Sequence, residues 1–183
     1  MDLEQLFTDR LILREFSPTV ADDVFLNYSE KDQMKFLGLQ LKSELQKEQQ
    51  NYKDGLSTFN RKFLYFHLII KESKKLIGWC GYHTWYINHQ RAELGYILTD
   101  SSEKGKGYMS EAIIPVIKFG FDKMKLNRIE AFTGLENTPS IKLLNKFNFT
   151  FEGQLREHYF TKNKLEDSKL YSLLKSEYNS QIK

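Results

Sequence analysis

The sequence of 183 residues has little of what marks a secreted or membrane-spanning protein. Cys80 is its only cysteine, so no disulfide can form within the chain, and we expect a reducing, cytoplasmic setting. The first residues, MDLEQLFTDR, have neither a basic head nor an apolar segment, so they do not predict a signal peptide. No apolar run in the sequence approaches the ~20 residues that span a bilayer.

An excess of charge and a metal-binding pattern are also missing. The formal net charge of +3 falls short of the basic surface expected of a nucleic-acid-binding protein. The four histidines show no metal-ligand spacing, so we expect no metal site; they are His67, His83, His89 and His158. No linker rich in Pro, Gly or Ser divides the chain, which predicts a single domain over residues 1–183.

The residue pattern predicts an α/β protein with a mixed sheet. We expect strands at 10–16, 63–70, 75–86, 91–98, 128–133, 149–160 and 169–174, and helices at 18–28, 43–59, about 108–124 and 140–146. Pro115 lies inside the third helix, where it removes a backbone hydrogen bond, so we expect a kink or a rearranged first turn.

A glycine-containing stretch, SSEKGKGYMSEA at residues 101–112, joins a predicted strand to that helix. Backbone N–H groups at a helix start have no intrahelical acceptor, and glycines let a ligand approach the backbone closely. Such a junction binds phosphates. Neither the P-loop spacing nor the dinucleotide fingerprint is present, and an ordinary flexible loop is the alternative interpretation.

Six further segments accompany this stretch in a fixed order: 8–14 (TDRLILR), 77–81 (IGWCG), 91–96 (RAELGY), 126–131 (LNRIEA), 137–140 (NTPS) and 147–153 (FNFTFEG). Together with 105–112 they resemble the GCN5-related N-acetyltransferase (GNAT) superfamily, and within it the RimJ/RimL-like branch that acetylates N-termini of ribosomal proteins. The resemblance covers nearly the whole chain. Ser102 departs from the family pattern, which has Gln or Arg there, and Asn148 stands where Gly is usual.

The resemblance implies a GNAT fold of about seven mostly antiparallel strands flanked by about four helices. It also implies an enzyme, an acyltransferase that takes acetyl-CoA as donor and needs no metal. The residues implied to bind the pyrophosphate are Lys104, Gly105, Lys106, Gly107, Tyr108, Met109 and Ser110. Those implied to contact the pantetheine arm are Tyr96, Ile97, Leu98 and Asn137. Packing is the alternative role for Tyr108 and Met109.

Two residues are candidates for the chemistry. Glu93 is the expected general base, through a water molecule, and its alternative role is an exposed carboxylate paired with Arg91. Ser140 is the expected proton donor to the thiolate, although the segment 137–140 is also typical of a helix N-terminus. The resemblance places a tyrosine at position 144 in some relatives, but this chain has Leu144.

The acceptor amine is inferred from its pKa. A free α-amino group has a pKa of about 7.7–8.0 and a lysine amine a pKa of about 10.4. The free energy needed to deprotonate lysine is therefore ~3.4 kcal/mol higher. A protein N-terminus is therefore the leading acceptor, with ribosomal proteins as the first candidates and the loops around 28–42 and 160–168 shaping the acceptor site. A small amine (polyamine, amino sugar or amino acid) and a non-catalytic acetyl-CoA-binding module are the alternatives. The sequence does not fix the oligomeric state, and a homodimer is compatible with it.

Overall fold

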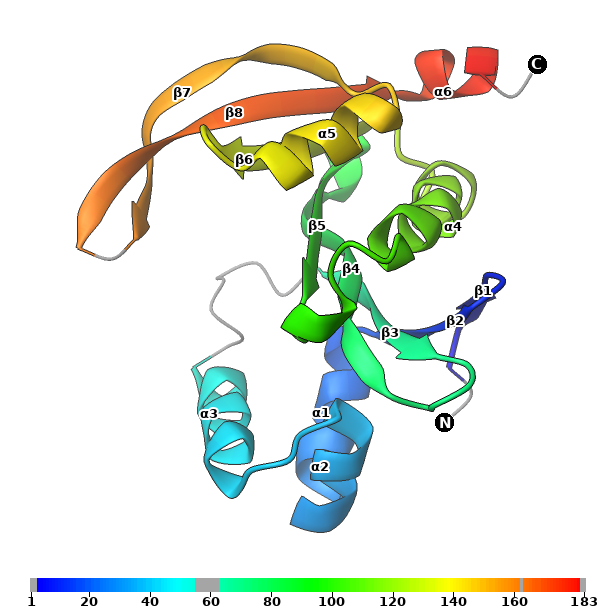
Figure 1. Cartoon of the computed structure of the whole chain (residues 1–183), viewed down its shortest axis with the longest axis vertical. Helices are drawn as coiled ribbons and strands as arrows, with labels where there is room; N and C mark the ends of the chain where they lie inside the picture. The colour runs from blue at the N-terminus through cyan, green and yellow to red at the C-terminus, as the bar shows by residue number, and fades with distance from the viewer. Residues whose placement is uncertain (1–2, 55–62, 162, 182–183) are drawn as a thin grey trace. The chain divides into compact units, whose positions relative to one another are not determined.

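The computed structural model describes residues 3–54, 63–161 and 163–181 (Figure 1). The chain divides into two compact units, one formed by Met1–Thr84 with Tyr96–Val116 and the other by Trp85–Gly95 with Ile117–Lys183. Strand β5 (Arg91–Leu98) and helix α4 (Tyr108–Asp122) each have residues in both units. Within the described residues, none of the helices is long and apolar enough to cross a membrane.

The sheet of the first unit is antiparallel and runs in the order β1 (Gln5–Phe7), β2 (Leu11–Phe16), β3 (Leu64–Ile70) and β4 (Leu76–Tyr86). The C-terminal end of β5 (Arg91–Leu98) follows β4, where the Thr99 N–H donates to the Ile77 carbonyl at 2.9 Å. Alternation along β2 buries Leu11 and Leu13 completely. Ile12 and Arg14 point to the opposite face.

Three helices belong to this unit: α1 (Pro18–Asn27), α2 (Glu30–Leu37) and α3 (Lys42–Lys53), which contact one another (Figure 1). The expectation of a loop over 28–42 is wrong, because α2 occupies most of that stretch. Its end signals are present in the sequence: the Ser29 side chain accepts from the Asp32 N–H, and Gly38 ends the helix at φ +69°. The helix predicted at 43–59 ends at Lys53 as described, and residues 55–59 lie outside the described residues.

Helix α4 (Tyr108–Asp122) follows the glycine stretch and continues through Pro115 as one helix. The kink expected at Pro115 stays a prediction. One residue after the proline, the Val116 carbonyl accepts a hydrogen bond at 2.9 Å from the hydroxyl of Tyr82, which is completely buried. This bond ties the helix to β4 within the first unit.

The second unit carries the start of β5, then β6 (Arg128–Gly134), β8 (Lys164–Leu174) and β7 (Thr150–Thr161) in that spatial order. Strands β5 and β6 are parallel and the other pairs are antiparallel. Helix α5 (Thr138–Lys146) precedes the long β7–β8 hairpin, and α6 (Lys175–Gln181) follows it (Figure 1). The predicted mixed, mostly antiparallel α/β fold is confirmed. Within the described residues there are eight strands and six helices, and β1, α2 and α6 were not predicted.

Gly78 provides a test of the packing of the first unit. It lies at a bulge where β3 and β4 shift register, with φ +156°, and an added Cβ would meet the Ile97 carbonyl oxygen at 2.0 Å and the Leu98 Cα at 2.9 Å. We predict that Gly78→Ala lowers the free energy of unfolding by about 3 kcal/mol or prevents folding. Gly134→Ala is the control, because its added Cβ meets nothing within 4 Å. Equal denaturant midpoints for the two variants would contradict the packing described here.

Candidate functional site

The turn before α4 has the backbone conformation that its glycines allow. Gly105 and Gly107 have φ values of +77° and +84°, in the left-handed region that other residues rarely adopt. An added Cβ at Gly105 would meet nothing within 4 Å, so the glycine serves the conformation and leaves the turn open. The turn follows a short 3₁₀ segment, Ser101–Glu103, and leads directly into Tyr108 at the start of α4.

This turn presents a row of unused hydrogen-bond donors. The N–H of Lys104 donates to the Ser101 carbonyl, and that of Glu111 donates to the Gly107 carbonyl. Between them, the N–H groups of residues 105–110 find no acceptor among the described protein groups. These donors lie at the positive end of the helix dipole. The arrangement is suited to a phosphate or diphosphate group.

Ion pairs set the charges around the turn. The Lys106 ammonium lies 2.8 Å from the buried Glu103 carboxylate, and Lys75 pairs with both Glu103 and Asp100. Hydrogen bonds from Lys75 and then from Ser102 hold the pKa of Asp100 well below its usual range. Ser102 makes two of these bonds, because its N–H and its hydroxyl both donate to the Asp100 carboxylate, at 2.8 and 2.7 Å. Lys104 is exposed, and the described residues provide no ion pair for it.

A clamp from the N-terminal segment holds the turn. The Arg10 guanidinium donates to the Lys106 carbonyl at 3.0 Å and to the Glu111 carboxylate at 2.6 Å, and lies 4.4 Å from the centre of the Tyr108 ring. The Thr8 hydroxyl and the Arg10 N–H also donate to Glu111. Burial alone would raise the pKa of Glu111, but these hydrogen bonds outweigh it and lower the pKa. Sequence reasoning used residues 8–14 only as a motif and assigned no role to this clamp.

Strand β5 carries predicted residues in both units. Ala92 and Leu94 are buried, and Glu93 projects half-buried from the other face, as the alternation predicted. In the first unit Tyr96 and Leu98 are half-buried and Ile97 is 47% exposed. Within the second unit, the pairing of β5 with β6 covers Arg91–Glu93 against Arg128–Glu130.

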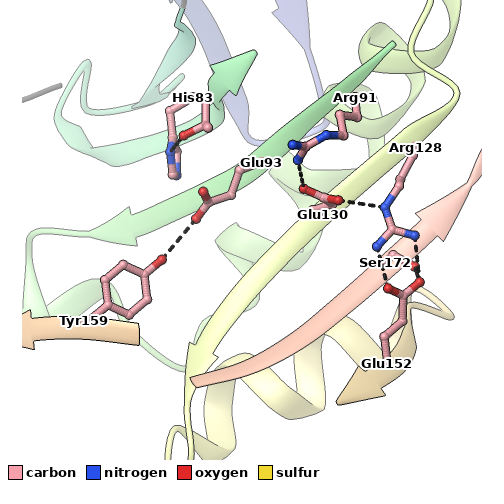
Figure 2. A network of polar contacts seen from close by, with 9 residues as sticks. His83, Arg91, Glu93, Arg128, Glu130, Glu152, Tyr159 and Ser172 are labelled. Atoms are coloured by element: carbon pink, nitrogen blue, oxygen red, sulfur yellow. Dashed lines mark hydrogen bonds and ion pairs between the residues drawn. The ribbon is translucent and has the colours of Figure 1, made fainter. Parts of the chain in front are cut away.

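An ion-pair network surrounds the start of these parallel strands (Figure 2). Glu130 accepts from Arg91 at 2.6 Å and from Arg128 at 2.7 Å. Arg128 also donates two hydrogen bonds to Glu152, at 2.7 and 2.5 Å, and Glu152 accepts from Ser172. Arg91, the ion-pair partner considered for Glu93 in its alternative role, is thus bonded to Glu130.

The Glu93 carboxylate faces a tyrosine. The Tyr159 hydroxyl donates to it at 3.5 Å (Figure 2). Burial, followed by the negative charge of Glu93, raises the pKa of Tyr159 to about 12, so the phenol stays protonated at neutral pH. Tyr159 lies beside a register shift in the β7–β8 hairpin, where the Glu157 N–H donates to Asp167 at 2.8 Å. Sequence reasoning missed Tyr159, because strand periodicity gives no signal for a contact made across a bulge.

Asn137 and Ser140 form the start of α5. The Asn137 side chain accepts from the Ser140 N–H at 3.3 Å, so the helix begins at Thr138 rather than at 140. The segment 137–140 is a helix N-terminus, as its alternative interpretation expected, with Asn137 rather than Ser140 as the cap, and the roles in acetyl transfer stay predictions. Leu144 is buried in the core, and Asn148 adopts φ +57°, so the turn after α5 forms with asparagine in the place of glycine. In the described part of the chain, no group of three His, Cys, Asp or Glu side chains could hold a metal ion.

Comparison with known proteins agrees with this architecture. The acetyltransferase (GNAT) domain family matches residues 10–150. An uncharacterized N-acetyltransferase of Bacillus licheniformis, p20, is 37% identical over 181 residues, which is 96% of this chain and 99% of that protein.

Two solved structures share the fold. The spermidine/spermine N-acetyltransferase SpeG from Vibrio cholerae, in mutant form, superposes with a TM-score of 0.68 at 22% identity, covering 95% of this chain and 100% of that one. The ribosomal-protein-S5-alanine acetyltransferase from Vibrio fischeri gives a TM-score of 0.66 at 22% identity, covering 96% of this chain and 98% of that one. At these identities the likeness concerns the fold.

The ion-pair network predicts a pH dependence of stability. Hydrogen bonds from Arg128 lower the pKa of Glu152 to about 2, so the ionised carboxylate stabilises the fold above its unfolded pKa, and this contribution is lost as the pH falls toward 2. We predict that Glu152→Gln lowers the unfolding free energy by roughly 1 kcal/mol at pH 7, a modest value because the ion pair is partly exposed. The difference in unfolding free energy between wild type and variant should shrink below pH ~4.5, where the unfolded carboxyl is protonated.

Urea unfolding of both proteins between about pH 7 and about pH 2.5 measures this difference. Glu136→Gln, at an exposed position, is the matched control and should leave stability nearly unchanged. A gap between wild type and Glu152→Gln that stays constant over the whole range would exclude the ionised pair as its source.

Proposed function

The chain belongs to the family of GNAT acetyltransferases, and we propose that it acetylates the N-terminal α-amino group of a protein, with ribosomal proteins as the leading acceptors. It is an acyltransferase, and enzymes of this family use acetyl-CoA. A non-catalytic binding module is therefore set aside. One observation carries the donor half of the proposal: the row of unpaired N–H groups at residues 105–110, just before and within the first turn of α4.

In this proposal the glycine turn holds the diphosphate of acetyl-CoA. Gly105, Lys106, Gly107, Tyr108, Met109 and Ser110 supply the backbone donors, and the exposed Lys104 adds the positive charge of its side chain. Because backbone N–H groups supply most of the binding, we expect Ser102 in place of Gln or Arg to weaken or rearrange the contacts without loss of the site. Tyr96, Ile97 and Leu98 on β5, and the amide nitrogen of Asn137, are the proposed contacts to the pantetheine arm.

The proposed reaction is a direct transfer. The neutral amine attacks the thioester carbonyl carbon, a C–N bond forms, and the C–S bond breaks to release the thiolate of CoA. Glu93 receives the proton that the amine loses, through a water molecule, and Ser140 donates a proton to the thiolate. Ser140 regains a proton from water, to which Glu93 releases the one that it received, so the net result is transfer of one proton from the amine to the thiol. The neighbouring carboxylates Glu130 and Glu152 are less suited to the role of base, because they are bonded to arginines: Glu130 to Arg91 and Arg128, and Glu152 to Arg128.

An α-amino group fits this machinery better than a lysine or a polyamine. A carboxylate base is weak, and an α-amino group with a pKa of about 7.7–8.0 is partly neutral at pH 7 without help. The fold relatives include enzymes named for a ribosomal-protein alanine and for spermidine, so the fold itself does not choose between them. The titration of the amine is what favours the protein N-terminus.

A panel of acceptors tests the choice. The purified protein and acetyl-CoA are mixed with peptides bearing a free N-terminus, with the same peptides blocked at the N-terminus but carrying an internal lysine, with spermidine and with an amino sugar. We predict thiol release and a mass gain of one acetyl group with the free peptides, and kcat/KM values at least about tenfold lower with the other amines. Turnover of spermidine or the amino sugar alone would overturn the proposed acceptor while leaving the donor intact.

Glu93→Gln tests the base. We predict a loss of about 10²–10⁴-fold in kcat/KM for the preferred acceptor, with the affinity for acetyl-CoA unchanged. The activity should partly return at higher pH, where more of the amine is neutral without a base. Glu72→Gln, an exposed residue in the β3–β4 turn, is the matched control. Full activity of Glu93→Gln at pH 7 would remove Glu93 from the mechanism.

A further inference from the structure

A groove in the first unit lies apart from the glycine turn. It has a volume of about 660 Å³ and is lined by residues of β1, β2 and β3, of α2 with the end of α1 and the turn before α2, and of the β3–β4 turn. Ile12 and Ile69 provide apolar surface from the sheet, and Tyr28 and Phe36 provide aromatic surface. None of the residues that line it belongs to the turn at 104–110. Its size is in the range of small-molecule sites.

A guanidinium without a counter-ion lines this groove. The Arg14 Nη2 donates to the Phe36 carbonyl at 2.5 Å and contacts His67 Nδ1 at 3.1 Å, while the guanidinium lies 3.7 Å from the centre of the Phe36 ring. The Arg14 Nε is buried and has no hydrogen-bond partner. Among the described residues, no carboxylate pairs with this side chain.

The partners that Arg14 does have are neutral. Burial, followed by the nearby Arg14 charge, lowers the pKa of His67 to about 3, so its ring is uncharged and acts as an acceptor. The Phe36 carbonyl lies in the last turn of α2, where the helix dipole supplies only a partial negative charge. A half-buried cation in this setting is costly to keep, because buried charges are normally paired.

The rest of the lining adds positive charge. Lys35 and Lys74 also line the groove. Asp32 is the one carboxylate among the lining residues, and it already accepts from the Ser29 hydroxyl at 2.6 Å. The groove therefore has a net excess of cations beside apolar and aromatic walls. That combination is complementary to an anion carried on an apolar body.

We infer that this groove is an accessory binding site for a small carboxylate with an aromatic or branched apolar body, held by Arg14. The Arg14 guanidinium supplies the positive charge that attracts the carboxylate, and Tyr28, Phe36, Ile12 and Ile69 contact the body. The inference does not depend on the identity of the acceptor amine.

Phenylacetate is the probe, followed by calorimetry and by NMR shifts of the Ile12 methyl groups and the Tyr28 and Phe36 rings. Phenylacetamide has the same body without the charge, and acetate and inorganic phosphate have charge without the body. We expect saturable binding of phenylacetate at millimolar or lower concentration, binding of each of the other probes at least about tenfold weaker, and no competition by saturating acetyl-CoA.

Variants locate the site. Arg14→Gln should weaken phenylacetate binding by about tenfold or more, since a charge-assisted hydrogen bond is lost. Lys35→Gln, at an exposed position that leaves the fold intact, should weaken it about twofold to threefold through the reduced positive potential. Arg156→Gln, exposed in the second unit, is the matched control and should bind like the wild type.

Four results would overturn the inference: no binding of phenylacetate at about 10 mM, equal binding of phenylacetamide, equal binding of phosphate, or displacement by acetyl-CoA. Unchanged affinity in a folded Arg14→Gln protein would do the same. If Arg14→Gln does not fold, two other measurements test whether phenylacetate binds in the groove: the affinity of Lys35→Gln and the wild-type NMR shifts at Ile12 and Tyr28. Shifts confined to residues outside the groove would then reject the proposed site.

Discussion

The site depends on hydrogen-bond donors that the fold leaves without acceptors. Left-handed conformations at Gly105 and Gly107 turn the chain into α4 so that the N–H groups of residues 105–110 meet no described protein acceptor. An anion with several oxygens satisfies such donors without any particular side chain. Arg10 and Glu111 keep the turn in this conformation by joining it to the segment before β2.

Repulsion between two carboxylates is the second constraint on the structure, and it acts next to the proposed base, Glu93. Glu93 and Glu130 are register partners in the parallel β5–β6 pair, and two like charges at this position repel unless they are compensated. Both arginines are bonded to Glu130, and Arg128 is also bonded to Glu152, which compensates the repulsive charge, while the Glu93 carboxylate accepts from the Tyr159 hydroxyl. The ion pairs thus stabilise the start of the two parallel strands.

Patterns local in the chain predicted well. Local residue types located β2 to β6, with alternation over residues 91–98, and the glycine spacing located the turn before α4, because each depends on neighbouring residues only. Helix α2 was missed although Ser29 and Gly38 signal its ends, since its polar surface gave little apolar periodicity. Other contacts join residues far apart in sequence, and a single sequence contains no signal for them. They are the pairing of Arg91 with Glu130, the clamp of Arg10 on Glu111 and the approach of Tyr159 to Glu93.

An amide NMR titration with acetyl-CoA tests the role of the glycine turn most directly. We predict that the N–H resonances of residues 105–110 move together, with one dissociation constant, because these donors bind the diphosphate. S-acetylpantetheine, which lacks the diphosphate, should leave the same resonances nearly in place. Resonances of 105–110 that stay fixed at saturating acetyl-CoA, or that move equally with S-acetylpantetheine, would show that this turn does not bind the diphosphate.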